Sequence, residues 1–135
     1  MASILKVDEL QGITAAGDIT VTSEGGAATQ SLQQGLVKVW FLYDGSGTPA
    51  FLDSFNTSSL TDHATGDHSV NFTNAMSNAN YSLGGAVGNN NNGDVSTSNL
   101  RRGVSATTAS RNTIGYPSAL FDYNRIGGNI CGDLA

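Results

Sequence analysis

The segment that most constrains the fold is LVKVWFLYD at 36–44, because large apolar side chains fall on both faces of its period-two pattern. One face comprises Val37, Val39, Phe41 and Tyr43, and the other comprises Leu36, Trp40 and Leu42. A strand that is apolar on both faces needs cover on both, one from the second layer of a sandwich and one from a neighbouring subunit. The interface residues predicted in this strand are Val37, Val39, Trp40, Phe41 and Tyr43.

Strand and turn signals follow this segment at short intervals. The turn DGSGTP (44–49) leads into AFLDSFN (50–56), which is predicted to pair with 36–44. In LTDHATGDHSVNFT (60–73), Thr65-Gly66 marks a second hairpin turn, after which Val70 and Phe72 point inward.

Weaker signals complete the pattern. A further strand is predicted at Tyr81 to Val87, where Gly84-Gly85 indicates a bulge or a close backbone approach. Segments 95–108 and 114–131 read as further strands, and no helix longer than two turns is predicted. We therefore expect an all-β fold, with residues 32–135 forming an antiparallel β-sandwich or jelly-roll-like domain.

Residues 1–31 hold too little apolar mass for a core and are predicted to be an extended N-terminal arm for attachment or oligomerisation. Asp8 and Glu9 interrupt what would be the apolar core of a secretory leader, and no apolar stretch approaches the length of a membrane span. We expect a soluble chain without membrane insertion. The predicted attachment residues of the arm are Ile4, Leu5, Val7, Leu10 and Ile13.

Charge and cysteine content narrow the classes of partner. Six basic against eleven acidic residues give a net charge of −5, which argues against a nucleic-acid partner. The single cysteine, Cys131, excludes an intrachain disulfide. Packing and association with further copies are expected to stabilise the fold, since a domain with ten aromatic residues in the whole chain is marginal alone.

Clusters that could carry chemistry are few. The sequence DHATGDH (62–68) could bring His63 and His68 together with two carboxylates as a metal site, but a solvated polar hairpin tip is favoured, and no metal is predicted. The run NNNNGD (89–94) is predicted to be a loop rather than a calcium site. No nucleophile elbow, phosphate loop or zinc-protease motif occurs, so we expect no enzyme activity and no cofactor.

The aromatic residues and the arginines can each have either a structural role or a ligand-binding role. Aromatic rings could stack on sugars, although core or interface packing explains most of them, and Tyr81 and Tyr116 are retained as candidate ligand residues. The arginines are expected to pair with carboxylates rather than bind phosphate. Arg101, Arg102, Arg111 and Arg125 are assigned to partners among Asp94, Asp122 and Asp133.

The run GTPAFLDSFNTSSLTDHATGDHSVNFTNAMSNANYSL (47–83) resembles a segment of virion structural proteins of tailed phages, particularly marine ones, of the tail-fibre or collar-fibre type. The termini ILKVDELQGITAAG (4–17) and ICGDLA (130–135) are similar to the termini of the same proteins. His68 and Ala64 depart from the pattern, which commonly has an aromatic and a glycine there. The matching positions are Asp53, Ser54, Phe55, Asn56, Ser58, Ser59, Asp62, Thr65, Gly66, Asp67, Val70, Asn71, Phe72, Thr73, Met76, Ala79, Asn80 and Tyr81.

The resemblance implies a non-enzymatic, β-rich fibre or spike subunit of a virion, assembled in the host cytoplasm. It implies a homotrimer whose N-terminal arm docks to other virion proteins. Two alternatives stay open, a tip that binds a host-surface glycan and a protein that decorates the capsid surface.

Overall fold

A computed structural model describes residues 4–13, 19–23, 25–88, 99–116 and 119–135. The chain divides into two units, Met1–Leu36 and Val37–Ala135. The regular elements among the described residues are all strands and no helix occurs among them, so the predicted all-β class is confirmed. The boundary between the units follows Leu36, whereas the arm was expected to end at residue 31.

The N-terminal unit contains one small hairpin. Strand β1 (Thr20–Thr22) pairs antiparallel with β2 (Thr29–Ser31). The turn between them closes through Ser23, whose backbone N–H donates to the carbonyl of Ala28 at 2.8 Å. A two-stranded hairpin of this size is marginally stable in water unless something packs against it.

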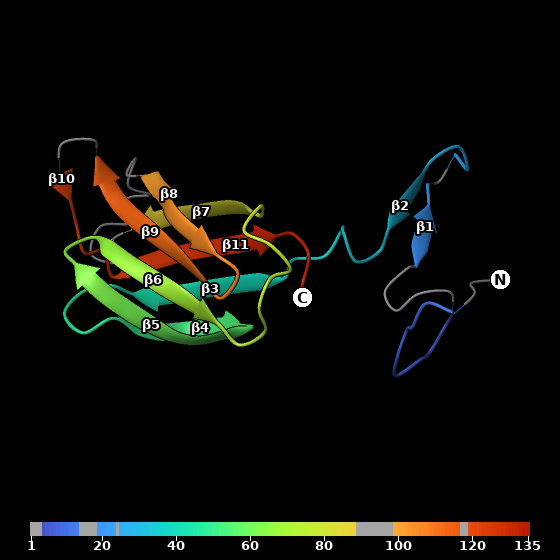
Figure 1. The fold of residues 1–135 in the computed structure, drawn as a ribbon, viewed down its shortest axis with the longest axis horizontal. Coiled ribbons are helices and arrows are strands. Elements are labelled where there is room, and N and C mark those ends of the chain that lie inside the picture. The colour runs from blue at the N-terminus through green and yellow to red at the C-terminus, as the bar shows by residue number, and fades with distance from the viewer. Residues whose placement is uncertain (1–3, 14–18, 24, 89–98, 117–118) are drawn as a thin grey trace. The chain divides into compact units, whose positions relative to one another are not determined.

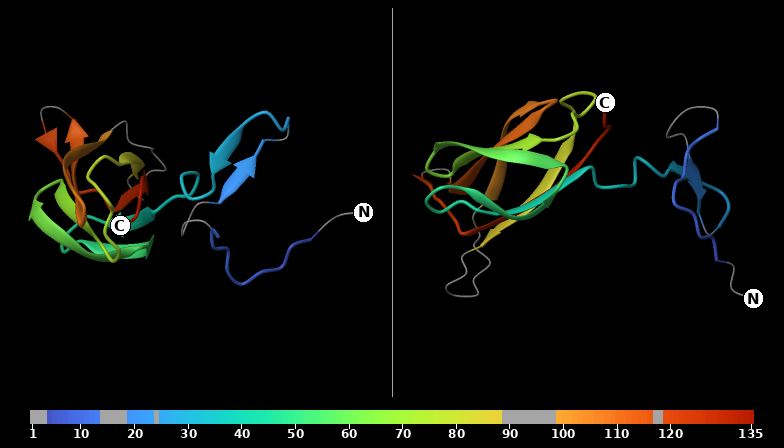
Figure 2. Two further views of the ribbon diagram at one scale, coloured as in Figure 1. Left: turned by 45° about the vertical axis from the view of Figure 1, so that its right-hand side comes forward. Right: turned by 90° about the horizontal axis from the view of Figure 1, so that it is seen from below.

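The C-terminal unit is a sandwich of two antiparallel sheets that curl around one core (Figures 1 and 2). One sheet has the strand order β4-β3-β11-β7, and the other has the order β10-β9-β6-β5 with β8 also paired to β9. The strands are β3 (Val39–Asp44), β4 (Ala50–Phe55), β5 (Thr57–Ala64), β6 (Asp67–Phe72), β7 (Ser82–Gly88), β8 (Asn99–Ala106), β9 (Ala109–Tyr116), β10 (Ala119–Leu120) and β11 (Arg125–Cys131).

Both predicted hairpins are confirmed. Strands β3 and β4 pair through the turn after Asp44, and β5 and β6 pair across Thr65-Gly66. Between the two hairpins the chain passes from one sheet to the other at Asn56, whose φ is 57°. The left-handed conformation is more accessible to asparagine than to most residues, which suits it to this corner.

The glycine-rich strand β7 pairs with β11 in unbroken register, so the bulge predicted at Gly84-Gly85 is wrong. The irregularity of this sheet lies instead between Leu42 and Tyr43, where β4 contributes an extra residue. The closest approach is at Gly128, which pairs with Gly85, because a Cβ built on Gly128 would lie 2.5 Å from the ring of Phe41.

The core lies between the two sheets and matches the predicted inward faces. Val70 and Phe72 are buried, as expected. The prediction that Val39, Phe41 and Tyr43 belong to a subunit interface is wrong, because all three are buried inside the single sandwich. Their side of β3 faces the second sheet, so the interface candidates left in this segment are Val37 and Trp40. The buried apolar residues are Val39, Phe41, Tyr43, Val70, Phe72, Met76, Tyr81, Val87, Ile114, Ile126 and Ile130.

Candidate functional site

The outer face of the β4-β3-β11-β7 sheet carries large side chains on one half and small ones on the other. Residues that lie opposite each other on paired strands point to the same face. One outward row therefore runs Phe55, Trp40, Asn129, Gly84, and the next runs Asp53, Leu42, Gly127, Ala86. At the end of the sheet, Ala50 lies opposite Asp44, and Arg125 lies opposite Gly88.

The large half lies on β3 and β4 and is only partly covered. Trp40 is 39% exposed and its cross-strand neighbour Phe55 is 54% exposed. Leu52, the extra residue of β4, is also exposed. Contiguous exposed apolar residues mark interaction surfaces more often than isolated ones do. We name this half, with Leu42, the aromatic half.

The small half lies on β11 and β7. The outward residues of β7 are Ser82, Gly84, Ala86 and Gly88, none larger than serine. Two glycines of this strand stand out in the sequence, but the signal for a flat strand surface is the period-two run of small residues at 82, 84, 86 and 88. We name this half, with Gly127, the flat half.

Asn56 holds the end of the aromatic half in place. Its Nδ2 donates to the carbonyl of Lys38 at 3.1 Å, and its Oδ1 accepts from the backbone N–H of Asn74 at 2.8 Å. These bonds tie the corner after Phe55 to the beginning of β3. They lie next to the pair that Phe55 forms with Trp40 and hold the chain in place there.

A polar cluster lies where the β5–β6 hairpin meets the sheet opposite. His68 is 1% exposed, and a 3.3 Å hydrogen bond joins its Nδ1 to the Tyr43 hydroxyl. Its Nε2 lies 3.8 Å from Oδ1 of Asp62 and 3.7 Å from Oδ1 of Asp122. The expectation of a solvated hairpin tip is thus wrong for His68, because this strand turns its side chain into the sandwich. Burial is the main reason that the pKa of Tyr43 lies well above its ordinary value.

His63 lies apart from this cluster. It is exposed on β5, and its Nε2 shares a 2.8 Å hydrogen bond with the Ser69 hydroxyl. The two histidines therefore point to opposite faces of the sheet and do not converge. Among the described residues, no group of three or more His, Cys, Asp or Glu is arranged to hold a metal ion.

Strand β9 continues the polar cluster inside the sandwich. Asn112 lies opposite His68, and both Asn112 and Ser110 are fully buried. The Ser110 hydroxyl donates to Oδ1 of Asn112 at 3.0 Å, and Nδ2 of Asn112 donates to the backbone carbonyl of Ser110 at 3.2 Å, so both buried side chains are hydrogen-bonded. This pair could not be predicted, because nothing in the polar sequence of β9 shows which side chains turn inward.

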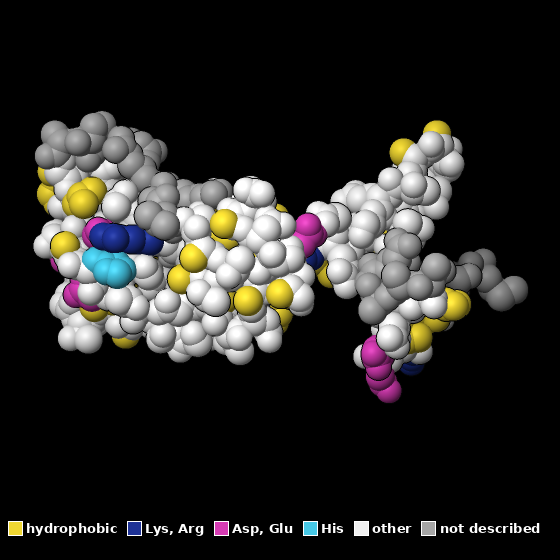
Figure 3. Space-filling model, viewed as in Figure 1, with side chains coloured by type: hydrophobic (Ala, Val, Ile, Leu, Met, Phe, Trp, Pro, Cys, Tyr) yellow, Lys and Arg dark blue, Asp and Glu magenta, His cyan; other side chains and the backbone are white. Residues whose placement is uncertain are grey.

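The ion pair of Arg111 differs from the predicted one. Arg111 binds Asp67 with two hydrogen bonds, of 2.9 Å from Nε and 2.7 Å from Nη2, rather than Asp94, Asp122 or Asp133. This bidentate contact crosses from β9 to β6 and holds the pKa of Asp67 below its ordinary value. In Figure 3, the histidine and several acidic and basic side chains gather at the left-hand end of the sandwich, further acidic and basic atoms lie at its right-hand end, and most of the surface between is uncharged.

Of the two predicted sugar ligands, Tyr81 is contradicted by the structure. Tyr81 is 3% exposed, its ring packs edge-on against Phe72, and its hydroxyl donates to the carbonyl of Ala109 at 2.9 Å, so its assignment to stacking on a ligand is wrong. The side chain of Tyr116 lies outside the described part of the chain, as do the NNNNGD loop and the side chains of Arg101 and Arg102.

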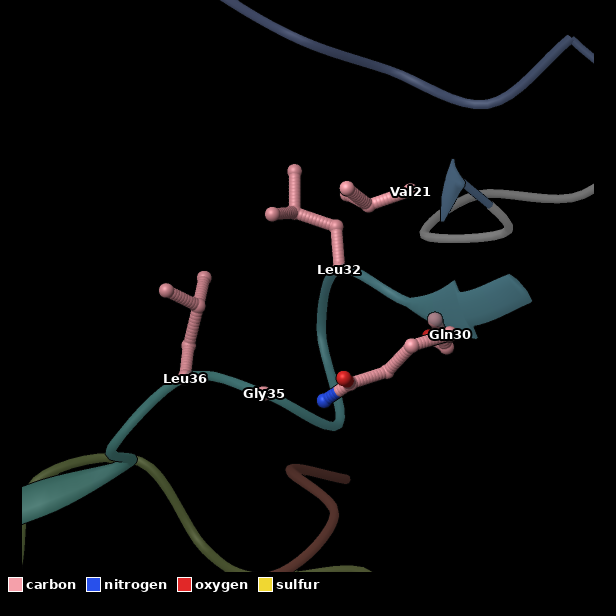
Figure 4. Close-up of a pocket in the computed structure, with 6 residues that line it drawn as sticks. Val21, Gln30, Leu32, Gly35 and Leu36 are labelled. Carbon is pink, nitrogen blue, oxygen red and sulfur yellow. The ribbon is translucent and has the colours of Figure 1, made fainter. Parts of the chain in front are cut away.

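The N-terminal unit exposes the attachment residues predicted for it. Ile4 is 78% exposed and Ile13 is fully exposed. Val21, Leu32 and Leu36 project to one side of the hairpin (Figure 4), where they line a pocket of about 180 Å³. This volume is below the roughly 300 Å³ of the smallest common ligand sites. The predicted attachment residues with exposed side chains are Ile4, Leu5, Val7, Leu10 and Ile13.

Within the described residues, no helix has the length and apolar character needed to cross a bilayer. Searches of protein-family models, curated proteins and solved structures find no match to this chain. The surfaces described above are therefore the features from which a function can be proposed.

Proposed function

We propose that this chain is a non-enzymatic structural protein of a virion, a homotrimeric subunit of a phage tail fibre or collar fibre. Its N-terminal residues would attach it to other virion proteins, and its sandwich would associate with further copies. The resemblance of residues 47–83 to such proteins motivates the class. The observation that carries the proposal is the exposure of apolar side chains along the N-terminal unit.

In an isolated chain, the apolar side chains of the arm stay in water, which costs free energy. Each square ångström of apolar surface removed from water is worth about 25 cal/mol, so Ile4, Leu5 and Leu10 represent several unused kilocalories per mole of binding energy. The two-stranded hairpin of the same unit also gains stability when something packs on it. An attachment function uses both features, because docking buries the side chains and orders the hairpin.

Particle incorporation tests the attachment role. In the full chain, Ile4→Ser with Leu5→Ser removes two apolar contacts from the arm and is expected to reduce incorporation at least tenfold. The matched control is Lys6→Ser, which changes a neighbouring side chain without removing a branched apolar group. Normal incorporation of the double variant would show that these residues do not attach the chain.

Glycan binding is the second candidate function, and the row Phe55, Trp40, Asn129 favours it. Exposed aromatic rings can stack on sugars while a neighbouring amide binds hydroxyl groups. Calorimetric titration with glycans that bind in an array screen would support this role if Trp40→Ala abolished binding and Phe121→Ala, at another exposed aromatic residue, did not. A chain that binds no glycan in the array would contradict it.

A capsid-decoration role would use the same surfaces at a different place. Immunogold labelling of particles distinguishes a fibre position from the capsid surface.

A further inference from the structure

We propose that proton uptake by His68 reverses the hydrogen bond between its ring and the Tyr43 hydroxyl, so that this contact between the two sheets responds to pH. Tyr43 lies on β3 in one sheet, and His68 lies on β6 in the other. Histidine is the side chain whose charge ordinarily changes between about pH 8 and about pH 5. The inference goes beyond the proposed function and does not depend on it.

The surroundings of the neutral ring decide which of its nitrogens carries the proton. Nδ1 of His68 lies 3.3 Å from the Tyr43 hydroxyl. Nε2 faces the carboxylate oxygens of Asp62 and Asp122, at 3.8 Å and 3.7 Å. A lone pair on Nε2 would point at two anions, whereas an N–H there is attracted by them. The proton of the neutral ring is therefore on Nε2, and Nδ1 accepts a hydrogen bond from Tyr43.

The Tyr43 hydroxyl keeps its own proton across this pH range. Burial raises the pKa of Tyr43, and the negative charge of Asp122 raises it further. A proton that arrives at His68 binds at Nδ1, since Nε2 already carries one. The phenol oxygen must then accept where it donated before, and the hydroxyl proton turns away from the ring. Proton uptake thus converts a neutral O–H···N bond into a charge-assisted N–H···O bond.

Two carboxylates are in place to balance the charge of the protonated ring. His68 is 1% exposed, and a buried imidazolium without a partner would be costly. Asp62 approaches Nε2 from β5, where it is the cross-strand neighbour of His68. Asp122 approaches from the segment between β10 and β11. The backbone N–H of Gly66 donates to Oδ1 of Asp122 at 2.6 Å, which keeps this oxygen near the ring.

The other elements packed around the ring add little net charge. Strand β9 contributes Asn112, the uncharged cross-strand neighbour of His68. The turn after β3 contributes Gly45, where an added Cβ would lie 3.0 Å from Cε1 of the ring. On β6 itself, Asp67 interacts electrostatically with the ring, but Arg111 binds its carboxylate with two hydrogen bonds. The charge of the protonated ring is therefore balanced by the two carboxylates at Nε2.

An NMR titration of the full chain between about pH 8 and about pH 5 tests the switch. The chain has two histidines, so His63→Gln leaves His68 as the only imidazole and assigns its signals. At the alkaline end we expect a proton on Nε2 and none on Nδ1. Acidification should protonate Nδ1, and the ring signals of Tyr43 should move with the same midpoint.

Three outcomes of this titration would overturn the inference. The first is a proton on Nδ1 at the alkaline end, because the bond to Tyr43 would then have no reversal to make. The second is a ring of His68 that stays neutral to the acid end. The third is a set of Tyr43 signals that does not follow the protonation of the ring.

Removal of the two carboxylates tests how the charge is balanced. Asp62→Asn with Asp122→Asn keeps the shape of both side chains, and we expect at least about a tenfold loss of proton affinity at His68. Asp8→Asn with Asp53→Asn is the matched control, because it removes the same number of charges from the arm and from β4. An equal loss in both double variants would mean that net charge governs the ring, and the inference would fail.

A single substitution guards against loss of folding in the double variant. The side chain of Asp62 is 51% exposed, so Asp62→Asn should leave the circular dichroism spectrum unchanged. We expect at least about a threefold loss of proton affinity at His68 in this variant. A folded Asp62→Asn chain with unchanged proton affinity at His68 would overturn the inference.

Discussion

The two units of this chain have similar amino-acid compositions but differ in how well they bury their apolar side chains. The sandwich places eleven apolar side chains in one buried cluster between two sheets. The N-terminal unit has a hairpin of two three-residue strands and leaves Ile4, Leu5, Leu10 and Ile13 exposed. Both are rich in glycine, serine and threonine.

The difference shows that composition does not decide which part of this chain folds by itself. The central strands of the sandwich come from distant parts of the sequence, since β11 lies between β3 and β7, and β9 lies between β6 and β8. Closing these long-range pairs buries enough apolar surface to offset the loss of chain entropy. In the described part of the N-terminal unit, the one strand pair joins β1 to β2, which are close in the sequence.

The largest contrast is expected at two glycines that have nearly the same backbone conformation. Gly66 in the sandwich has φ 64° and Gly26 in the arm has φ 67°. A Cβ on Gly66 would lie 2.6 Å from the backbone nitrogen of Phe121 and 2.7 Å from the carbonyl oxygen of Ile114, whereas a Cβ on Gly26 meets nothing within 4 Å. Gly66→Val should destabilise the sandwich by more than about 4 kcal/mol or prevent folding.

Urea unfolding of the sandwich measures this contrast. Gly26→Val is the matched control, because it adds the same backbone strain of about 1–3 kcal/mol to the arm alone and should leave the sandwich midpoint unchanged. Equal midpoints for the two variants would mean that the packing around Gly66 does not constrain the turn.

The second largest difference between the two units is expected when an apolar side chain in each is replaced by alanine. Ile130 is completely buried on β11, so Ile130→Ala should lower the free energy of unfolding by about 2–5 kcal/mol. Ile4→Ala, at an exposed position of the arm, should change it by less than about 0.5 kcal/mol. Urea unfolding, at concentrations where the chain is monomeric, measures both values. A comparable loss of unfolding free energy for the two variants would show that the arm packs on the sandwich.

The sequence predicted those parts of the sandwich that depend on local alternation. Both hairpins and the inward face of 70–72 follow from a period-two pattern and turn residues, whereas the same pattern did not show which apolar face of 39–43 turns into the core. The order of the sheets could not be predicted, because alternation shows that a strand has an inner face without showing which strand lies beside it. The same limit explains why Tyr81 was assigned to a surface that it does not reach.

The candidate surface was predicted only in part. A second apolar face on 36–44 was expected, and Trp40 lies on it. The flat half depends on the pairing of β11 with β7, which brings together segments far apart in the sequence. The burial of His68 was missed because its partner Tyr43 belongs to the opposite sheet, and no local pattern links the two.

The buried polar contact between the sheets should have a moderate effect. Tyr43→Phe removes the hydroxyl that His68 Nδ1 contacts and leaves a buried ring nitrogen without this partner. We expect a loss of about 1–3 kcal/mol in the free energy of unfolding, as for other unsatisfied buried polar groups. The exposed Phe121→Leu is the control for general changes of aromatic residues. A neutral result for Tyr43→Phe would show that the imidazole finds another partner.

The smallest expected effect is a change in the acid sensitivity of the sandwich. Because Arg111 lowers the pKa of Asp67 in the folded state, the stabilisation is present above the ordinary aspartate value near 3.9 and is lost as the pH falls below it toward the folded pKa. Asp67→Asn should therefore flatten the fall in stability between about pH 4 and pH 2.

Asp8→Asn in the arm is the matched control, since either substitution changes the net charge from −5 to −4. Urea midpoints recorded across this pH range should change slope for Asp67→Asn alone. Asp44 contributes to the slope that remains in Asp67→Asn, because hydrogen bonds from the Ser46 hydroxyl and backbone also lower its pKa. Equal flattening by both substitutions would mean that net charge, rather than the contact between β6 and β9, governs the acid response, and the two units would then not differ in this respect.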